Sequence, residues 1–145
     1  MDWKDNLLTT DDEIRELLRK TKSIAVLGIK PESHAGQPAF YVSKYMADAG
    51  YDIIPVPVYY PEVTTILGKQ VYRRLDEVPV GIDLLNVFRR PQDIAMHVPE
   101  ILAKKPKAVW FQLGIRNDEA AEQFAEAGIK VVQDLCLMVE HRALL

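Results

Sequence analysis

Short apolar runs alternate with segments of helical periodicity along most of this chain. The runs are continuous, which is typical of strands in a parallel sheet that is buried on both faces. Each ends in, or is followed by, a glycine, a proline or a polar residue that can begin a loop. The pattern therefore predicts five strands: residues 23–28, 51–56, 82–88, 108–112 and 129–132.

The segments around these strands carry signals for the start of a helix. Thr10 opens a capping-box pattern with a glutamate three residues later. Pro38 and Pro91 can each open a helix, because the missing N–H of proline costs nothing in the first turn. Asn117 and Asp134 carry side chains that cap helix N-termini. The predicted helices are residues 11–22, 38–50, 91–102, 117–128 and 134–140.

Two parts of the chain are less regular. Pro99 falls inside the third predicted helix and should kink it or mark a restart. The prolines that follow the second strand favour extended chain. Within residues 62–80 we expect a short strand around Lys69–Tyr72 and one helical turn around Arg74–Val78.

The order of elements, one helix followed by repeated strand–helix units, sets the fold class. It predicts an α/β, Rossmann-like three-layer α/β/α sandwich with a mostly parallel sheet of about five strands. A length of 145 residues is that of one domain, so residues 1–145 should form a single unit. Residues 1–9 precede the first helix signal and are expected to be a flexible N-terminal tail.

Composition and charge narrow the functional classes. The chain is 48% hydrophobic and 27% charged, and 18 basic against 21 acidic residues give a net charge of −3. This balance provides no global field for nucleic acid or an anionic membrane, so neither is expected as a partner. No apolar run approaches the ~20 residues of a membrane span. Residues 1–10 lack the features of a signal peptide, and a cytoplasmic protein is expected.

The loops that follow the predicted strands are the places where chemistry is expected, since ligands of open parallel sheets bind beyond the carboxyl ends of strands. Gly28 ends the first strand and Gly36 precedes a helix, but the full three-glycine dinucleotide pattern is missing. The loop could bind a nucleotide or simply connect a strand to a helix. After the second strand, Val56 and Pro57 stand where an NAD site has an acid, and they could line an adenine instead.

Residues 88–91, Phe-Arg-Arg-Pro, are more informative. Arg89 and Arg90 lie between a buried strand and a helix N-terminus, where anions are favoured. Arginine makes bidentate contacts to phosphate, so we favour phosphate contact over a pair of solvated side chains. Lys30 and Arg116 belong to neighbouring loops and could add positive charge to the same rim.

Cys136 is the only cysteine and lies just inside a predicted helix N-terminus. That position can make a thiol reactive, although many single cysteines are inert and buried. His34, His97 and His141 show no metal-ligand spacing with it, so no metal site is predicted. Asp93 and His97 lie one turn apart, and we expect them on a solvated helix face.

At these residues the sequence resembles the small, stand-alone CoA-binding domain proteins, which are related to the nucleotide-binding domain of the succinyl-CoA synthetase α subunit. The resemblance extends from about residue 10 to the C-terminus. It depends on a Phe-Arg-Arg-Pro piece, a Trp-x-Gln-x-Gly piece and a Cys-x-x-x-Glu-His piece in this order. The matching stretches are residues 24–28, 41–51, 86–91, 109–115 and 134–141.

The resemblance implies a Rossmann-like fold and CoA as the bound ligand. By that resemblance the loop at Gly28, Ile29 and Lys30 would approach the pyrophosphate. Val56 and Pro57 would border the adenosine. The family does not imply a reaction.

Two further walls of the site follow from the same resemblance. Phe88 and Arg89 would form one of them, joined by the neighbouring arginine. Gln112, Gly114 and Ile115 would reach the pantetheine side.

Four positions differ from the usual pattern of that family. Gln37 stands where an arginine is usual before the second helix, and it is included among the predicted CoA contacts. Ile29, Pro57 and Leu135 replace a small polar residue, an asparagine and an arginine. Each change removes a polar group from the expected phosphate rim.

The sequence therefore predicts non-catalytic binding of coenzyme A or an acyl-CoA at the carboxyl edge of a parallel sheet. One alternative is an enzyme that uses Cys136 in thiol or acyl exchange. The other is an interaction module with a degenerate nucleotide site, which would bind a protein partner or a second copy of itself.

Overall fold

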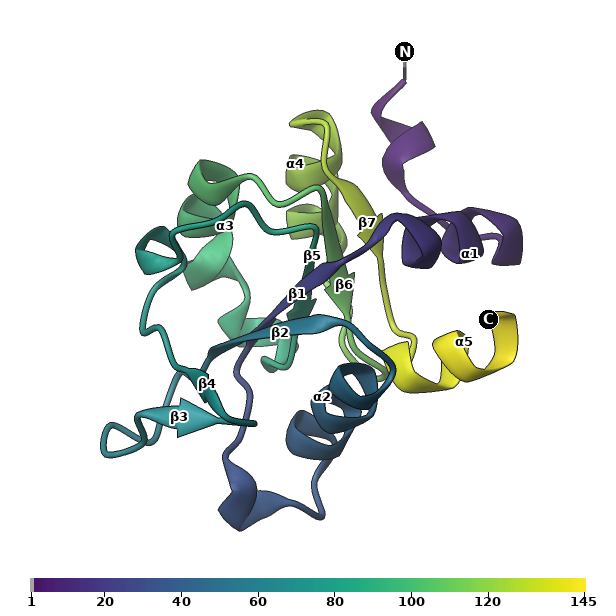
Figure 1. Cartoon of the computed structure of the whole chain (residues 1–145). Helices are drawn as coiled ribbons and strands as arrows, with labels where there is room; N and C mark the ends of the chain where they lie inside the picture. Colours follow the sequence, from purple (N-terminus) through teal and green to yellow (C-terminus); the bar gives the residue numbers. More distant parts are fainter. Residues whose placement is uncertain (1) are drawn as a thin grey trace.

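The computed structural model describes residues 2–145, in which a five-stranded parallel sheet lies between two layers of helices (Figure 1). All five predicted strands are present, with ends within two residues of the expected ones. This confirms the predicted α/β, Rossmann-like architecture. In spatial order the strands are β2 (Asp52–Val56), β1 (Ser23–Leu27), β5 (Leu84–Val87), β6 (Ala108–Phe111) and β7 (Lys130–Val132).

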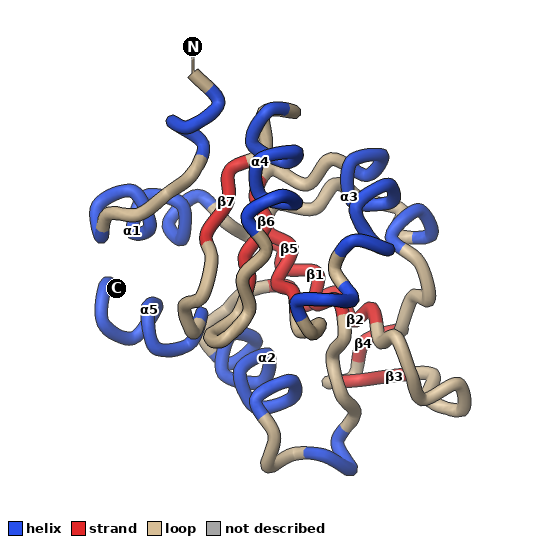
Figure 2. Tube along the Cα trace, turned by 180° about the vertical axis from the view of Figure 1, so that it is seen from behind, coloured by secondary structure: helices blue, strands red, loops and turns tan. Residues whose placement is uncertain are grey.

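Alternate strand residues pack into two separate cores, one on each face of the sheet. Ala25 and Leu27 of β1 face one core, whereas Ile24 and Val26 face the other. The five helices divide between the two faces accordingly (Figure 2). On the face of Ile24 lie α1 (Asp11–Lys20), α2 (Pro38–Asp48) and α5 (Leu137–Leu144), and on the opposite face lie α3 (Val98–Lys104) and α4 (Asp118–Glu126).

Most helices begin at the signals identified in the sequence. The Thr10 side chain and the Glu13 side chain form the complete capping box of α1. Asn117 caps α4 by accepting a hydrogen bond from the Ala120 N–H at 3.0 Å. The stretch after Pro91 first makes two 3₁₀ turns, and α3 begins only at Val98, so Pro99 marks a restart.

The expected start of the last helix was wrong. Asp134 has φ +60°, and its carboxylate accepts a hydrogen bond from the Gly114 N–H at 2.6 Å. It therefore joins two loops instead of capping a helix. Cys136 is the N-cap of α5, and Leu137 is its first residue.

The N-terminal segment is packed, in contrast to the flexible tail that we expected. Residues 3–6 form a 3₁₀ turn, and Leu7 makes an isolated parallel bridge with Val131 of β7. The Leu8 N–H donates to the Val131 carbonyl at 2.9 Å, and only 7% of Leu8 is exposed. The sequence did not predict this packing because the partner of Leu7, Val131, lies 124 positions away along the chain. Met1 lies outside the described residues.

The irregular stretch between β2 and β5 contains the expected short strand and turn. β4 (Lys69–Gln70) pairs with β3 (Thr65–Ile66), a strand that the sequence did not predict, and a 3₁₀ turn covers Leu75–Glu77. The Arg73 guanidinium holds the preceding loop by donating to the carbonyls of residues 59, 60, 61 and 63. Within residues 2–145, no helix combines the length and the hydropathy needed to cross a membrane.

Candidate functional site

The order of strands reverses between β1 and β5. From β1 the chain crosses to β2 on one side, and it later returns to β5 on the other side of β1. Beyond these two strands the chain continues to α2 on one face of the sheet and to α3 on the other, which leaves a crevice at the carboxyl ends of β1 and β5. Ligands of open α/β sheets bind at such a point.

Gly28 lets these two loops approach one another. It has φ +88°, a conformation that residues with a Cβ rarely adopt. A Cβ added at this position would lie 2.3 Å from the Phe88 carbonyl oxygen. The Phe88 N–H donates to the Leu27 carbonyl at 2.9 Å, which fixes the loop after β5 against the end of β1. Glycine is therefore required here.

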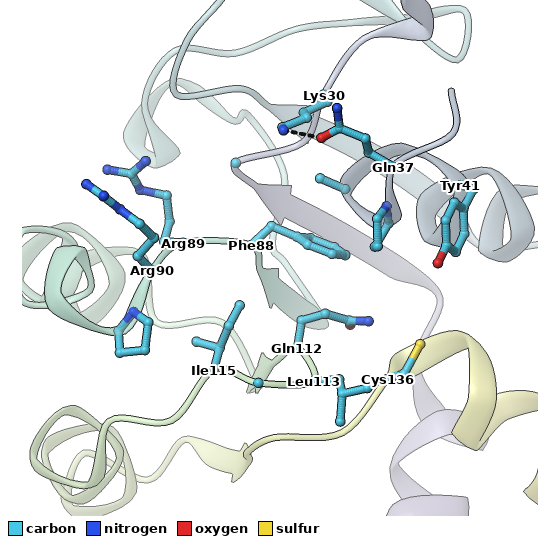
Figure 3. Close-up of a pocket in the computed structure, with 15 residues that line it drawn as sticks. Lys30, Gln37, Tyr41, Phe88, Arg89, Arg90, Gln112, Leu113, Ile115 and Cys136 are labelled. Carbon is cyan, nitrogen blue, oxygen red and sulfur yellow. Dashed lines mark hydrogen bonds between the residues drawn. The ribbon is translucent and has the colours of Figure 1, made fainter. Parts of the chain in front are cut away.

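A pocket of about 520 Å³ opens at this crevice (Figure 3). Its size falls in the range of small-molecule sites, about 300–1,000 Å³. Four loops and the first turn of α2 surround it. The structure thus brings together most of the residues that the sequence singled out, although they lie up to 108 positions apart.

The loop after β1 contributes Gly28, Lys30 and Gln37 to the pocket. The Lys30 ammonium donates to the Gln37 side-chain oxygen, which holds the lysine over the start of α2 (Figure 3). Gln37 is the N-cap residue of α2, and Pro38 is its first residue. The positive end of this helix dipole therefore faces the pocket, beside a lysine.

The loop after β5 contributes Phe88, Arg89 and Arg90. Arg90 is exposed and donates to Asp93 at 2.8 Å. Arg89 is less exposed, and its Nε donates to the imidazole of His97 at 3.1 Å. The prediction of a solvated face for Asp93 and His97 was wrong, since 8% of His97 is exposed and both residues contact these arginines.

The loop after β6 contributes Gln112, Gly114 and Ile115. Only 4% of Gln112 is exposed, and its side-chain oxygen accepts from the Leu137 N–H at 3.3 Å, which ties the loop to the start of α5. Half-buried Cys136, the N-cap of that helix, also lines the pocket.

Three predicted contacts are not brought to the pocket. Ile29, Val56 and Pro57 are buried, and none of them lines it. Ile29 and Val56 belong to the two different cores, because the loop after β1 turns the Ile29 side chain inward. Arg116 also lies elsewhere, paired with Asp118 at 3.0 Å.

His141, which follows Cys136 in the last helix, does not line the pocket. Its Nδ1 lies 2.9 Å from the Tyr45 hydroxyl, and its ring packs edge-on against Tyr51. Burial lowers the pKa of His141 below that of a free imidazole. The histidine thus anchors α5 to α2 and contributes nothing to the pocket.

Sequence reasoning missed several lining residues, among them the exposed Tyr41 of α2. Tyr41 lies three residues after Pro38 on α2, so helical spacing from the helix start could have placed it beside the pocket. Leu113 adjoins Gln112, and 64% of it is exposed. The other missed residues are Pro38, Ala39 and Pro91.

The two ends of the pocket differ in chemistry. Figure 3 shows the guanidinium groups of Arg89 and Arg90 at one end, with the Lys30 ammonium directed toward the same side. Tyr41, Leu113 and Cys136 lie at the other end. The arrangement suits a long ligand with anionic groups at one end and a less polar portion at the other.

Comparisons with known proteins agree with this geometry. The sequence profile of the family described as CoA binding domain matches residues 22–142. An uncharacterized protein, YneT of Bacillus subtilis (strain 168), is 38% identical over 129 residues, which cover 89% of this chain and 92% of YneT.

Two solved structures are similar over nearly the whole chain. A Thermus thermophilus protein, cell-free ID.343, superposes with a TM-score of 0.86 at 40% identity, covering 94% of this chain and 100% of its own. A hypothetical protein from Pyrococcus horikoshii OT3 gives a TM-score of 0.83 at 34% identity, covering 94% and 92%.

Proposed function

The chain belongs to the CoA-binding domain family, and from this premise we propose that it binds coenzyme A or an acyl-CoA in the pocket at the carboxyl ends of β1, β5 and β6, without catalysing a reaction. The observation that carries the proposal is the gathering of Lys30, Arg89 and Arg90 around a single pocket of a chain whose net charge is −3. CoA is a polyanion, and these side chains are suited to its phosphates.

The polarity of the pocket gives the ligand a direction. The phosphates lie toward Arg89, Arg90 and Lys30, where the start of α2 adds a favourable dipole. The pantetheine then extends past Gln112 toward Tyr41 and the loop after β6. A thioester or a free thiol would reach the end where Cys136 lies.

Isothermal titration calorimetry with CoA, dephospho-CoA, ATP and NAD tests the proposal. We expect CoA to bind most tightly, because its phosphates engage all three cations. Arg89→Gln should weaken CoA binding about tenfold or more, since a hydrogen bond to a charged group contributes about 1.5–3 kcal/mol. Adenosine binding should not change.

Arg116→Gln is the matched control. It removes the same charge from a neighbouring loop, but Arg116 is paired with Asp118 outside the pocket. We expect less than about a twofold change in CoA affinity, because exposed charges at a distance are screened. No heat with CoA at millimolar concentration, or equal losses in the two variants, would contradict the proposal.

A second candidate function is thiol–disulfide exchange, favoured by the position of Cys136 in the same pocket. In this step the Cys136 thiolate attacks one sulfur of CoA disulfide, and the disulfide bond of that molecule breaks. One CoA leaves as a thiolate and takes a proton from solvent. The other remains joined to Cys136 as a mixed disulfide.

Mass spectrometry after incubation with CoA disulfide distinguishes the two candidates. Exchange predicts a gain of one CoA that dithiothreitol reverses and that Cys136→Ser abolishes. Arg89→Gln should slow the reaction with CoA disulfide but not with cystamine, which has no phosphate. An unmodified Cys136 in the wild type would exclude this candidate and leave binding alone.

A further inference from the structure

Arg89 is held by a chain of hydrogen bonds that extends away from the pocket. Its Nε donates to His97 Nε2 at 3.1 Å. On the other side of the ring, His97 Nδ1 lies 2.7 Å from a Glu100 carboxylate oxygen. The second oxygen of Glu100 accepts from the Leu75 N–H at 3.3 Å, so the chain ends on the backbone beneath α3.

The chemistry of these groups fixes the proton on His97. A guanidinium has only donors, so the Nε2 atom that faces Arg89 must present a lone pair. The Glu100 carboxylate accepts, so Nδ1 must carry the hydrogen. Only the neutral Nδ1–H form of the imidazole satisfies both neighbours.

Protonation of His97 would disrupt this arrangement. It would place an N–H on Nε2, directly opposite the Arg89 N–H and beside a second positive charge. A competing acceptor is available, because an Asp93 oxygen lies 3.9 Å from the Arg89 guanidinium. Arg89 can therefore move to Asp93 when His97 becomes charged.

We propose that His97, oriented by Glu100, is a positioning residue that holds Arg89 at the cationic end of the pocket, and that protonation of His97 releases Arg89 and weakens the binding of phosphate-bearing ligands. The ligand part rests on the proposed function. The coupling of His97 to Arg89 does not depend on it.

The charged groups that face His97 determine how Arg89 responds when the imidazole is protonated. Glu100 stabilises a charged imidazole, whereas Arg89 opposes it. Arg90 already pairs with Asp93 at 2.8 Å. If the Arg89 guanidinium moves to Asp93, the two arginines therefore share that carboxylate. Arg74, a further cation at the start of the preceding 3₁₀ turn, is paired with Asp76.

Calorimetry with dephospho-CoA at about pH 5.5 and about pH 8 tests the ligand part, because the pyrophosphate keeps its charge at both values. At the higher pH the wild type should bind more tightly by about twofold to tenfold. This factor corresponds to the free-energy cost of ordering one long side chain, that of Arg89, which the ligand would have to meet once His97 is protonated. His97→Gln retains an acceptor that does not titrate, so its affinity should change less between the two values.

His97→Phe provides the comparison for a purely structural role. It fills the site but removes the acceptor, and we expect it to bind about twofold to tenfold more weakly at about pH 8, with little change on acidification. Thermal unfolding of each variant verifies that it is folded. Equal losses of affinity on acidification in the wild type and in His97→Gln would overturn the proposal.

A measurement on the ligand-free protein separates this proposal from the proposed function. In ¹⁵N NMR spectra, His97 should have a protonated Nδ1 and a bare Nε2 at about pH 8, and the Arg89 Nε–H signal should shift when His97 becomes protonated. If dephospho-CoA does not bind at either pH, the proposed function fails, while the spectra still decide the coupling. A proton on Nε2 at about pH 8 would refute the coupling itself.

Discussion

Replacing Gly28 by alanine should destabilise the protein, for two separate reasons. At φ +88° a residue with a Cβ is strained by about 1–2 kcal/mol. The new Cβ would also lie 2.3 Å from the Phe88 carbonyl oxygen, so the backbone would have to shift, and overpacking costs about 1–3 kcal/mol. We therefore expect the free energy of unfolding to fall by about 2–5 kcal/mol.

Gly114→Ala separates these two contributions. Gly114 has a similar φ of +83°, but an added Cβ would meet nothing within 4 Å. Its substitution should show only the conformational strain, about 1–2 kcal/mol. The difference between the two variants thus measures the close approach of the loops after β1 and β5.

Urea denaturation followed by circular dichroism gives both free energies. Thermal unfolding is a second measurement, with an expected shift of about 2–4 °C for each kcal/mol in a protein of this size. If Gly28→Ala and Gly114→Ala lost the same stability within about 0.5 kcal/mol, the contact with the Phe88 carbonyl would not constrain the fold.

Two further predictions concern the ends of the chain. Leu8→Ala should lower the free energy of unfolding by about 2–3 kcal/mol, because Leu8 is buried against the sheet. Leu113→Ala, at an exposed position, should change it by less than about 0.5 kcal/mol. Equal effects of the two substitutions in urea denaturation would contradict the packing of the N-terminal segment. Burial lowers the pKa of His141 in the folded protein, so on acidification the unfolded chain binds a proton at this histidine at a higher pH than the folded protein does. The free energy of unfolding should therefore decline as the pH falls below about 6.5, and His141→Gln should show a smaller decline. Parallel curves for the two proteins would exclude His141 as a source of this pH dependence.

The elements that could be predicted from the sequence are those determined by neighbouring residues. Thr10 and Glu13 are three positions apart and cap α1 as the local pattern indicates. The buried strands are continuous apolar runs, which can be recognised without any knowledge of their partners. The Rossmann-like fold follows from the order of these elements.

The errors occur where distant residues decide the local structure. Asp134 has a side chain suited to an N-cap, but its carboxylate accepts a hydrogen bond from the N–H of Gly114, twenty residues earlier in the chain. The helix therefore starts later, at Leu137. Leu7 and Leu8 have no local pattern, and Val131 determines where they lie.

The candidate site shows the same division. Arg89 and Cys136 were identified because residue type and position after a strand are visible in the sequence. The direction of a side chain within a loop is not visible. Ile29 follows Gly28 directly, yet the positive φ of the glycine turns the next side chain into the core. Tyr41 was missed for the converse reason, since it lies beside the apolar stripe of α2 and faces the pocket.

The N-terminal segment has a consequence for how copies of this protein behave toward one another. An outer strand presents unpaired backbone groups that can recruit another chain and start aggregation. Along β7, Leu7 and the Leu8 N–H occupy the position opposite Val131. At the opposite border, the Tyr72 N–H donates to the Pro55 carbonyl of β2 at 2.9 Å. Short pieces of the chain thus shield both borders of the sheet, and removing residues 2–8 should create a surface prone to self-association.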